Sequence, residues 1–427
     1  MTKSVSNPGF FECEHCADIS EEYDQKVVLL TGGAGFIGSH VAEALLERGD
    51  RVVIVDEIND YYDTRLKEAN LEYLHEKYTK MVSVYRGDIC DLDFMTDVFE
   101  RESPSHVCHL AARAGVRPSI QDPYIYVHSN IEGTTRMLDL SRKYLCKNFV
   151  YASSSSVYGC SKKEILSEQD AVEHPVSPYA ATKKSCELLA YTFNHLYGLN
   201  TTGLRFFTVY GPRGRPDMAP FKFIDRIFNG LEIQQYGDGT TSRDYTYISD
   251  IVDGVVSAID RPLGYEIFNL GNGRPYLLRD FISLVETCTE KKAVIQILPE
   301  QAGDVDRTCA DISKARELLD YNPKVTFEEG ITKTIEWYKE AHSRGLFNED
   351  RPIANAVRAS RAVSDLELSS FVQRAECQIR DRTKRILSPV HSSKFPHRKD
   401  FIYSSVDDLC ALVDENTTEV VVTNGNE

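Results

Sequence analysis

The sequence predicts an α/β fold: a Rossmann-type doubly wound parallel sheet with helices on both faces, followed by a smaller C-terminal substrate-binding lid domain. From residue 26 onward, short runs of β-branched residues alternate with amphipathic helical stretches, which is the order of βαβ units. The apolar runs are continuous rather than alternating, as in strands that helices cover on both faces. The expected strands are Val27 to Leu30, Arg51 to Val55, Val82 to Tyr85, Val107 to Leu110, Asn148 to Tyr151 and Thr201 to Phe206.

A glycine-rich loop follows the first expected strand and opens the first expected helix, Gly38 to Arg48. The loop reads Thr-Gly-Gly-Ala-Gly-Phe-Ile-Gly, with three glycines spaced by three. The first permits a tight turn, the second lets the backbone approach a pyrophosphate, and the third lets the helix pack on the strand. The loop therefore predicts a dinucleotide site made by Gly32, Gly35, Phe36, Ile37 and Gly38.

Acidic and small residues follow the next three expected strands. Asp56 ends the second strand, about twenty residues after the glycine loop, where a carboxylate accepts both ribose hydroxyls and repels a 2'-phosphate. NAD is therefore preferred to NADP as the cofactor. After the third strand, Asp88 and the backbone of Ile89 are placed to meet the adenine edge, although an ordinary helix cap also explains Asp88. After the fourth strand, Ala111 and Ala112 leave room for the cofactor.

A later segment, Ser-Pro-Tyr-Ala-Ala-Thr-Lys, places a phenol and an ammonium four residues apart. Ser177 is a good N-cap, Pro178 a natural first helical residue, and Gly198 can close the helix, so the segment predicts a helix from 178 to about 197. Tyr179 and Lys183 then lie on one face, and the ammonium favours the phenolate. The pair can act as a base, although the same spacing is common on ordinary helices.

Composition limits the classes of partner. The chain has 427 residues and a net charge of −16, which disfavours nucleic acid and an anionic membrane surface, so an anionic ligand must be held by local arginines, lysines and helix N-termini. No apolar run is long enough to span a membrane, and the polar N-terminus has no apolar signal core. The eleven cysteines are scattered and odd in number, which favours reduced thiols in a cytoplasmic protein.

The organisation along the chain suggests four regions. Residues 1–25 form a disordered N-terminal extension, 26–206 an NAD-binding domain, 207–342 a smaller substrate-binding region that partly interleaves with the sheet, and 343–427 a largely disordered tail. The helices expected in the third region are Phe221 to Asn229, Ser249 to Ile259, Leu278 to Thr287 and Ile312 to Leu319.

Taken in order, the motifs resemble those of the extended short-chain dehydrogenases/reductases, the NAD-dependent epimerase/dehydratase family. The glycine loop, Asp56, a serine run before Val-Tyr-Gly, and the Tyr-x-x-x-Lys pair carry this resemblance. Within the family the chain is most similar to UDP-glucuronate 4-epimerases, over roughly Lys26 to Ala341. The segments that resemble this group most are His109 to Arg117, Leu204 to Met218 and Arg243 to Tyr247.

The resemblance implies a catalytic set of Tyr179, Lys183 and Ser154. Tyr179 takes the proton of the sugar C4 hydroxyl as hydride passes to NAD, Ser154 bonds to the same oxygen, and Lys183 also holds the nicotinamide ribose. The 4-keto sugar turns over in the pocket and takes the hydride back on its other face, which interconverts UDP-glucuronate and UDP-galacturonate. The resemblance also suggests a homodimer with a four-helix interface.

The substrate site is expected to hold a UDP-sugar with a carboxylate. At the positions of Ser155 and Ser156, related dehydratases and decarboxylases carry acids, whereas a run of hydroxyls can donate to a bound carboxylate. Simple turn chemistry is the other explanation for these two serines. Bidentate arginine is an efficient way to hold carboxylates and diphosphates. The expected substrate contacts are Ser154, Ser155, Ser156, Thr208, Arg213, Arg215, Arg243 and Asp304, and Arg307 is a further candidate near the phosphates.

Three alternatives stay open. The first is a UDP-glucose/UDP-galactose 4-epimerase, the second a UDP-glucuronate decarboxylase, and the third a non-catalytic NAD-binding sensor or scaffold. No metal is expected, because Cys13-Glu-His-Cys16 lacks the second half of a closed zinc site. His109, at a strand end, is expected to be a satisfied core histidine rather than a base.

Overall fold

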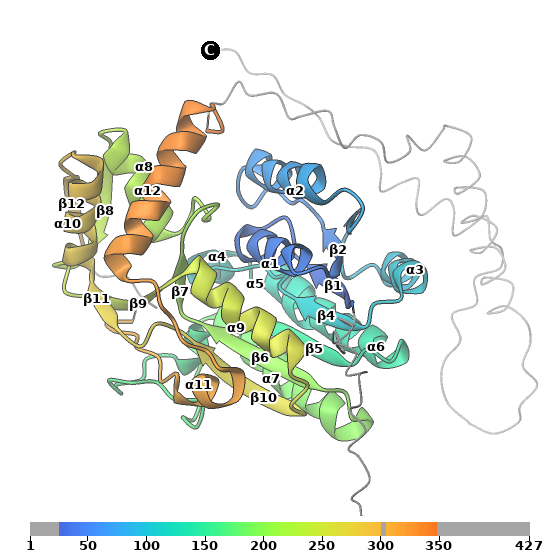
Figure 1. The fold of residues 1–427 in the computed structure, drawn as a ribbon. Helices are drawn as coiled ribbons and strands as arrows, with labels where there is room; N and C mark the ends of the chain where they lie inside the picture. Colours follow the sequence, from blue (N-terminus) through green and yellow to red (C-terminus); the bar gives the residue numbers. More distant parts are fainter. Residues whose placement is uncertain (1–24, 300–304, 348–427) are drawn as a thin grey trace, which may run out of the picture. The chain divides into compact units, whose positions relative to one another are not determined.

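The computed structural model describes residues 25–299 and 305–347, and its main element is a seven-stranded sheet with the order β10-β6-β5-β4-β1-β2-β3 (Figure 1). All of its strand pairs are parallel, which confirms the predicted fold class. β10 was not among the expected strands. The strands are β1 (Val27–Thr31), β2 (Arg51–Asp56), β3 (Val82–Arg86), β4 (His106–His109), β5 (Asn148–Ser154), β6 (Thr201–Phe206) and β10 (Tyr265–Leu270).

Helices cover both faces of this sheet. One layer contains α1 (Phe36–Glu47), α2 (Thr64–Tyr78), α9 (Ile248–Asp260) and α11 (Ser313–Leu319). The other contains α3 (Leu92–Glu102), α6 (Gly133–Lys143) and α7 (Pro178–Tyr197), with α4 (Val116–Gln121), α5 (Pro123–Tyr126) and the π-helical turn η1 (Val127–Glu132) packed near α7.

The strands are buried on both faces, as their continuous apolar runs indicate. In β1, Val28 and Leu30 belong to one hydrophobic core, and Leu29, between them, belongs to the other. Successive side chains of a strand point to opposite faces, so each apolar run contributes side chains to both cores. Because all of these strands are parallel, their carboxyl ends lie together at one end of the sheet, and an open α/β sheet binds its ligands there.

A second group of elements follows the carboxyl end of β6. It contains a three-stranded sheet of β7 (Thr208–Tyr210), β9 (Ser242–Tyr247) and β11 (Pro275–Leu277), and a parallel pair of β8 (Glu232–Tyr236) and β12 (Val294–Leu298). Its helices are α8 (Ala219–Phe228), α10 (Leu278–Thr289) and α12 (Phe327–Ser343), and Figure 1 shows them gathered on one side of the main sheet. The helices expected after residue 207 correspond, with small shifts at their ends, to α8 and α10 of this group and to α9 and α11 on the main sheet. α12 was not among the expected helices.

The caps of α7 are those that the sequence predicts. The Ser177 hydroxyl accepts the N–H of Ala180 at 3.1 Å, and Pro178 is the first helical residue. Gly198 closes the helix in the left-handed region with a φ of 68°. These caps fix where the helix begins, and therefore which face carries Tyr179 and Lys183.

Parts of the predicted organisation lie outside the described residues. Residues 1–24, with the Cys13/Cys16 pair, and residues 348–427 are among them, as is Asp304 in the short gap before residue 305. Within the described ranges, no helix has both the length and the apolar character needed to cross a membrane.

Candidate active site

The glycine loop between β1 and α1 forms a cradle that only glycine permits. Gly32 has a φ of 73°, and a Cβ there would lie 2.7 Å from the backbone N of Ala111. A Cβ on Gly38 would lie 2.1 Å from the carbonyl O of Gly32. α1 begins after Gly35 without a side-chain cap, so its first N–H groups are available to an anion. The loop therefore fits the pyrophosphate of a dinucleotide.

Two carboxylates lie beyond this cradle, after β2 and β3. Asp56 is 8% exposed, and its two oxygens accept the N–H groups of Ala34 at 3.1 Å and Ile58 at 2.9 Å. Burial raises the pKa of its carboxyl above the ordinary value. Asp88 accepts the N–H of Cys90 at 2.8 Å. Both carboxylates keep lone pairs that can accept from a ligand.

A cavity of about 390 Å³ runs along the carboxyl ends of the strands. It is lined by every residue that the sequence predicts for the cofactor: Gly32, Gly35, Phe36, Ile37, Gly38, Asp56, Asp88, Ile89, Ala111, Ala112, Tyr179 and Lys183. Five predicted substrate residues line it too, namely Ser154, Ser155, Ser156, Thr208 and Arg215. One cavity therefore brings the dinucleotide loop and the Tyr-Lys pair together.

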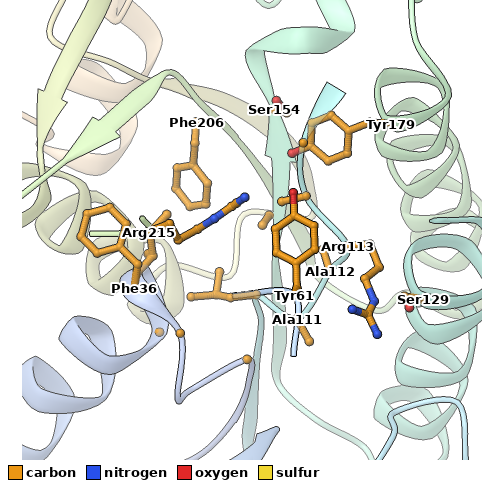
Figure 2. Close-up of a pocket in the computed structure, with 18 of the residues that line it drawn as sticks. Phe36, Tyr61, Ala111, Ala112, Arg113, Ser129, Ser154, Tyr179, Phe206 and Arg215 are labelled. Atoms are coloured by element: carbon orange, nitrogen blue, oxygen red, sulfur yellow. The ribbon is translucent and has the colours of Figure 1, made fainter. Parts of the chain in front are cut away.

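The three predicted catalytic side chains meet at the end of β5. The Lys183 side chain is buried, and its Nζ donates to the carbonyl O of Ala152 at 2.7 Å. The Oγ of Ser154 accepts the N–H of Ser156 at 3.2 Å, and Tyr179 packs edge-on against Tyr126, with the ring centroids 6.2 Å apart. Figure 2 shows Tyr179 and Ser154 on the same side of the cavity that both residues line. This geometry suits proton transfer at one oxygen between the two hydroxyls.

A buried ion pair lies behind these side chains. Glu187, on α7, accepts Nε and Nη2 of Arg205, on β6, both at 2.8 Å, and neither side chain is more than 3% exposed. Ser153 also donates to Glu187, at 2.7 Å, and Arg205 Nη1 donates to the hydroxyl of Tyr158 at 3.0 Å. Tyr158 ends the short 3₁₀ helix η2 (Ser155–Tyr158). The network therefore joins α7 to both sides of Ser154.

Arg215 also lines the cavity that contains Tyr179, Lys183 and Ser154. Its Nη2 pairs with Asp217 at 2.6 Å, and its guanidinium lies over the ring of Tyr61 at 5.3 Å. Figure 2 shows Arg215 entering the cavity between Phe206 and Tyr61, on the side of Tyr179. The structure thus places a partly buried cation, with a side chain 19% exposed, near the candidate catalytic groups.

A second cavity, of about 280 Å³, continues from the first. The two share Val116, Ser155, Ser156, Thr208 and Met218 in their linings. Arg243 and Arg307 line the second cavity, and no carboxylate does so among the described residues. Two arginines in a cavity whose described lining has no acid have the chemistry to hold a diphosphate.

The structure does not bring Arg213 to either cavity lining, contrary to its predicted substrate contact. Its Nη2 pairs with Glu43 of α1 at 2.7 Å, and its guanidinium lies over the ring of Tyr73 at 4.7 Å. This pairing directs the side chain toward α1 and away from the cavity. Asp304, the other predicted contact beyond the cavity linings, lies outside the described residues.

The cavity also contains residues that the sequence reasoning missed. Tyr61, Tyr62 and Lys67 line it from the connection after β2 and from α2. Lys67 is buried and donates to the carbonyl O of Asn59 at 2.7 Å. The sequence signal that points to this connection is the Asn-Asp-Tyr-Tyr cluster directly after the strand that ends in Asp56, because binding residues gather in loops at the carboxyl edge of a parallel sheet.

His109 is a core histidine, as predicted. One ring nitrogen lies 2.7 Å from the Thr31 hydroxyl and the other 3.0 Å from the Thr134 hydroxyl. Burial lowers the pKa of His109 to about 3. Both ring nitrogens are therefore satisfied away from the cavity, and the imidazole is neutral.

Comparison with known proteins identifies a family and several similar proteins. A model of the GDP-mannose 4,6-dehydratase family matches residues 29–334. A UDP-glucuronate 4-epimerase of Thermodesulfobacterium geofontis is 47% identical over 313 residues, which cover 73% of this chain and 96% of that protein.

Two solved structures are also similar. The first is a UDP-glucuronic acid 4-epimerase from Bacillus cereus in complex with UDP-glucuronic acid and NAD; it is 35% identical with a TM-score of 0.69 and covers 74% of this chain and 99% of that one. The second is a UDP-glucose 4-epimerase from Thermotoga maritima with UDP-glucose, 34% identical with a TM-score of 0.69 and the same coverage. Both acid and neutral sugars thus occur among similar structures.

Proposed function

The chain belongs to the GDP-mannose 4,6-dehydratase family of extended short-chain dehydrogenases/reductases, and from this premise we propose that it interconverts UDP-glucuronate and UDP-galacturonate. At the coarser level it is an NAD-dependent nucleotide-sugar epimerase, which is an isomerase. One observation carries the finer proposal. Arg215 enters the cavity that Tyr179, Lys183 and Ser154 line. The carboxylates in the described lining lie at or just after the carboxyl ends of β2 and β3, and they are Asp56, Glu57 and Asp88.

The chain's own residues account for the proton chemistry. When bound, NAD supplies the hydride acceptor at C4 and later returns the hydride. Tyr179 takes the proton of the C4 hydroxyl and gives it back, while Ser154 donates to the same oxygen. Lys183 uses one N–H on the carbonyl O of Ala152, which leaves two for the nicotinamide ribose and for stabilising the phenolate. Because the 4-keto sugar turns over between the two hydride transfers, C4 is inverted.

The sugar carboxylate needs a firm hold, because the oxidised sugar is a β-keto acid that readily loses carbon dioxide. Arg215 and Thr208, which line the cavity, keep the C5–C6 bond out of alignment with the carbonyl π system. Ser155 and Ser156 donate hydrogen bonds to the carboxylate without repelling it. Arg243 and Arg307, in the second cavity, hold the diphosphate of the UDP group.

The test is a product assay with the purified full-length protein. UDP-glucuronate is incubated with catalytic NAD, and the products are resolved by NMR. We expect UDP-galacturonate. A UDP-pentose product would identify a decarboxylase, and turnover of UDP-glucose in place of UDP-glucuronate would identify a neutral-sugar epimerase. A Tyr179→Phe protein is expected to lose a factor of about 10² to 10⁴ in kcat, and unchanged turnover would show that Tyr179 is not the base. No turnover of either sugar by the wild-type protein would favour the non-catalytic alternative.

We further propose a homodimer that pairs α7 and its neighbours with those of a second copy. α7 packs against α4, α5 and η1, and large apolar side chains are exposed there: Ile120, Tyr124, Val127, Leu188, Tyr191 and Leu196. A contiguous exposed apolar surface favours a protein interface. Light scattering after gel filtration tests it: Leu188→Glu should give a monomer, whereas Leu231→Glu, at an exposed position after the end of α8, should not.

A reducing compartment, such as the cytoplasm, is part of the same proposal. The cysteines in the described part of the chain are free thiols, and Cys90, Cys108, Cys146, Cys186 and Cys309 among them are buried. Unpaired buried cysteines are typical of proteins from reducing compartments.

A further inference from the structure

We propose that Arg213 is a positioning residue: by pairing with Glu43 of α1, it fixes the loop of residues 211–218 so that Arg215 points at the sugar carboxylate. The inference rests on the proposed function, because it takes the carboxylate as the ligand of Arg215. It assigns a role in sugar selectivity to two side chains, Arg213 and Glu43, that line neither cavity.

Two successive residues of the loop are tied to the helix that follows the dinucleotide loop. Arg213 Nη2 pairs with Glu43 at 2.7 Å, and the two side chains are only 15% and 17% exposed. The guanidinium also lies on the ring of Tyr73, whose hydroxyl donates to the same carboxylate. One residue earlier, the carbonyl O of Pro212 lies 2.9 Å from His40 Nε2. These contacts attach the loop to α1 from one side.

The backbone explains how one loop sends two arginines in different directions. Arg213 has a φ of 59°, in the left-handed region that non-glycine residues rarely adopt. The loop turns here, with Gly214 N–H donating to the carbonyl O of Gly211 at 3.2 Å. Two residues after Arg213, Arg215 enters the cavity (Figure 2). A strained conformation persists only where its surroundings hold it, and the ion pair with Glu43 supplies that hold.

The consequence concerns substrate selectivity. A guanidinium binds a carboxylate best in the bidentate geometry, which depends on orientation. Without the Arg213–Glu43 pair, the loop relaxes and the guanidinium of Arg215 is no longer held in the orientation that binds the carboxylate in a bidentate way. We therefore expect kcat/KM for UDP-glucuronate to fall by roughly 10-fold, the scale of one misplaced charged hydrogen bond. UDP-glucose, which has no carboxylate, should be affected much less.

The experiment is a double-mutant cycle of Glu43→Gln and Arg213→Gln in the full-length protein. Each single change should shift the selectivity between the two sugars equally, and the double change should add nothing further. Glu47→Gln is the control on the same helix. Glu47 pairs with Lys77 at 2.9 Å and accepts the Tyr78 hydroxyl at 3.1 Å, and neither partner belongs to the loop of residues 211–218, so this change should leave selectivity unchanged. A loss with Arg213→Gln but not with Glu43→Gln would mean that Arg213 contacts a ligand directly, and would overturn the proposal.

Arg213→Gly separates positioning from folding. Glycine removes the cost of the positive φ, which offsets part of the loss of the ion pair, so this variant should fold and yet show the same loss of selectivity. Wild-type selectivity in Arg213→Gly would overturn the proposal.

Hydrogen exchange of residues 211–218 separates the failure of this inference from that of the proposed function. Faster exchange in Glu43→Gln and Arg213→Gln supports the attachment of the loop to α1, whichever sugar the protein epimerises, and unchanged exchange overturns it. Faster exchange without a change in selectivity would overturn the positioning of Arg215 by this attachment, and would leave the proposed epimerase function untouched.

Discussion

At the scale of single residues, the proposed preference for an acid sugar rests on Arg215. Its guanidinium enters the cavity near Tyr179 (Figure 2), and its own partner, Asp217, is 34% exposed, so a substrate carboxylate can compete for it. A hydrogen bond to a charged group is worth about 1.5–3 kcal/mol. Arg215→Gln should therefore lower kcat/KM for UDP-glucuronate by roughly 10- to 100-fold, measured by steady-state epimerisation.

The comparison for Arg215 is the same variant with UDP-glucose. If the arginine contacts the carboxylate, turnover of the neutral sugar should hardly change. Arg215→Lys keeps the charge but loses the planar fork, and should lie between the wild type and Arg215→Gln. Equal losses with both sugars would contradict the assignment.

Asp56 is the residue that we expect to select NAD over NADP. It is buried at the end of β2 and already accepts two backbone N–H groups, so its orientation is fixed before a ribose arrives. Asp56→Asn should weaken NAD binding by roughly 10-fold, because a charged acceptor is lost, and should reduce the discrimination against NADP. Equilibrium binding to cofactor-free protein measures both effects, with Asp60→Asn, an exposed change in the same loop, as the control. Unchanged preference for NAD would refute this role.

At the scale of elements, some boundaries follow from local chemistry and others do not. Ser177, Pro178 and Gly198 predict both ends of α7, because caps act within a few residues. β10 is different: its sequence is Tyr-Glu-Ile-Phe-Asn-Leu, and its partner β6 lies far away in the chain. Its place in the sheet depends on tertiary pairing, which a local pattern does not contain.

The same distinction separates the site residues that were predicted from those that were missed. The glycine loop and the Tyr-Lys pair follow from spacing along regular elements. Arg213 and Arg215 stand two residues apart in a loop, and in an extended chain both would lie on one side. The positive φ of Arg213 sends them to different places, and Tyr61 enters the cavity from an irregular connection. Such backbone geometry is not encoded in a residue pattern.

The Glu187–Arg205 pair fixes α7 against the sheet. Glu187 follows Lys183 by one helical turn, and its side chain is fully buried with that of Arg205. Removing one member of a buried pair leaves the other charge uncompensated, which costs about 3–5 kcal/mol. Glu187→Gln should therefore lower the free energy of unfolding by about that amount, measured by urea denaturation.

The paired control removes both charges. Glu187→Met with Arg205→Met removes both buried charges; Lys184, which also pairs with Glu187 at 3.2 Å, is partly exposed and can be solvated. Such replacements are often nearly neutral, so this double variant should be closer to the wild type in stability than Glu187→Gln. A double variant as unstable as the sum of the single changes would show that the charges act independently.

At the scale of the whole molecule, the two cavities contain several cationic side chains although the protein is acidic overall. The chain carries a net charge of −16, yet Arg215, Arg243 and Arg307 line the connected cavities, and Lys67 and Arg113 line the first cavity as well. A cleft with one sign of charge concentrates ligands of the other. These cations therefore favour anionic ligands, such as the phosphates of a dinucleotide or a nucleotide-sugar, in a protein that is acidic overall.

Buried histidines make the stability of the fold depend on pH. His106 and His109 are 5% and 3% exposed, and burial lowers their pKa to about 4 and about 3. The ordinary value, 6.5, applies in the unfolded chain, which therefore binds more protons below that pH. Their contribution to stability is present above pH 6.5 and is lost as the pH falls toward 4. Between about pH 7 and about pH 5 each histidine should cost about 2 kcal/mol of unfolding free energy.

His109→Gln isolates this effect from the carboxylates. A carboxyl whose pKa is lowered in the folded protein, such as that of Glu187, reduces the free energy of unfolding only as the pH falls below its ordinary value of 4.5. A carboxyl whose pKa is raised, such as that of Asp244, has the opposite effect, because burial opposes its ionisation. Glutamine can bond to Thr31 and Thr134 but does not titrate. Urea denaturation at both pH values should therefore show a drop smaller by about 2 kcal/mol in the variant, and an equal drop would mean that His109 is not the group that takes up the proton.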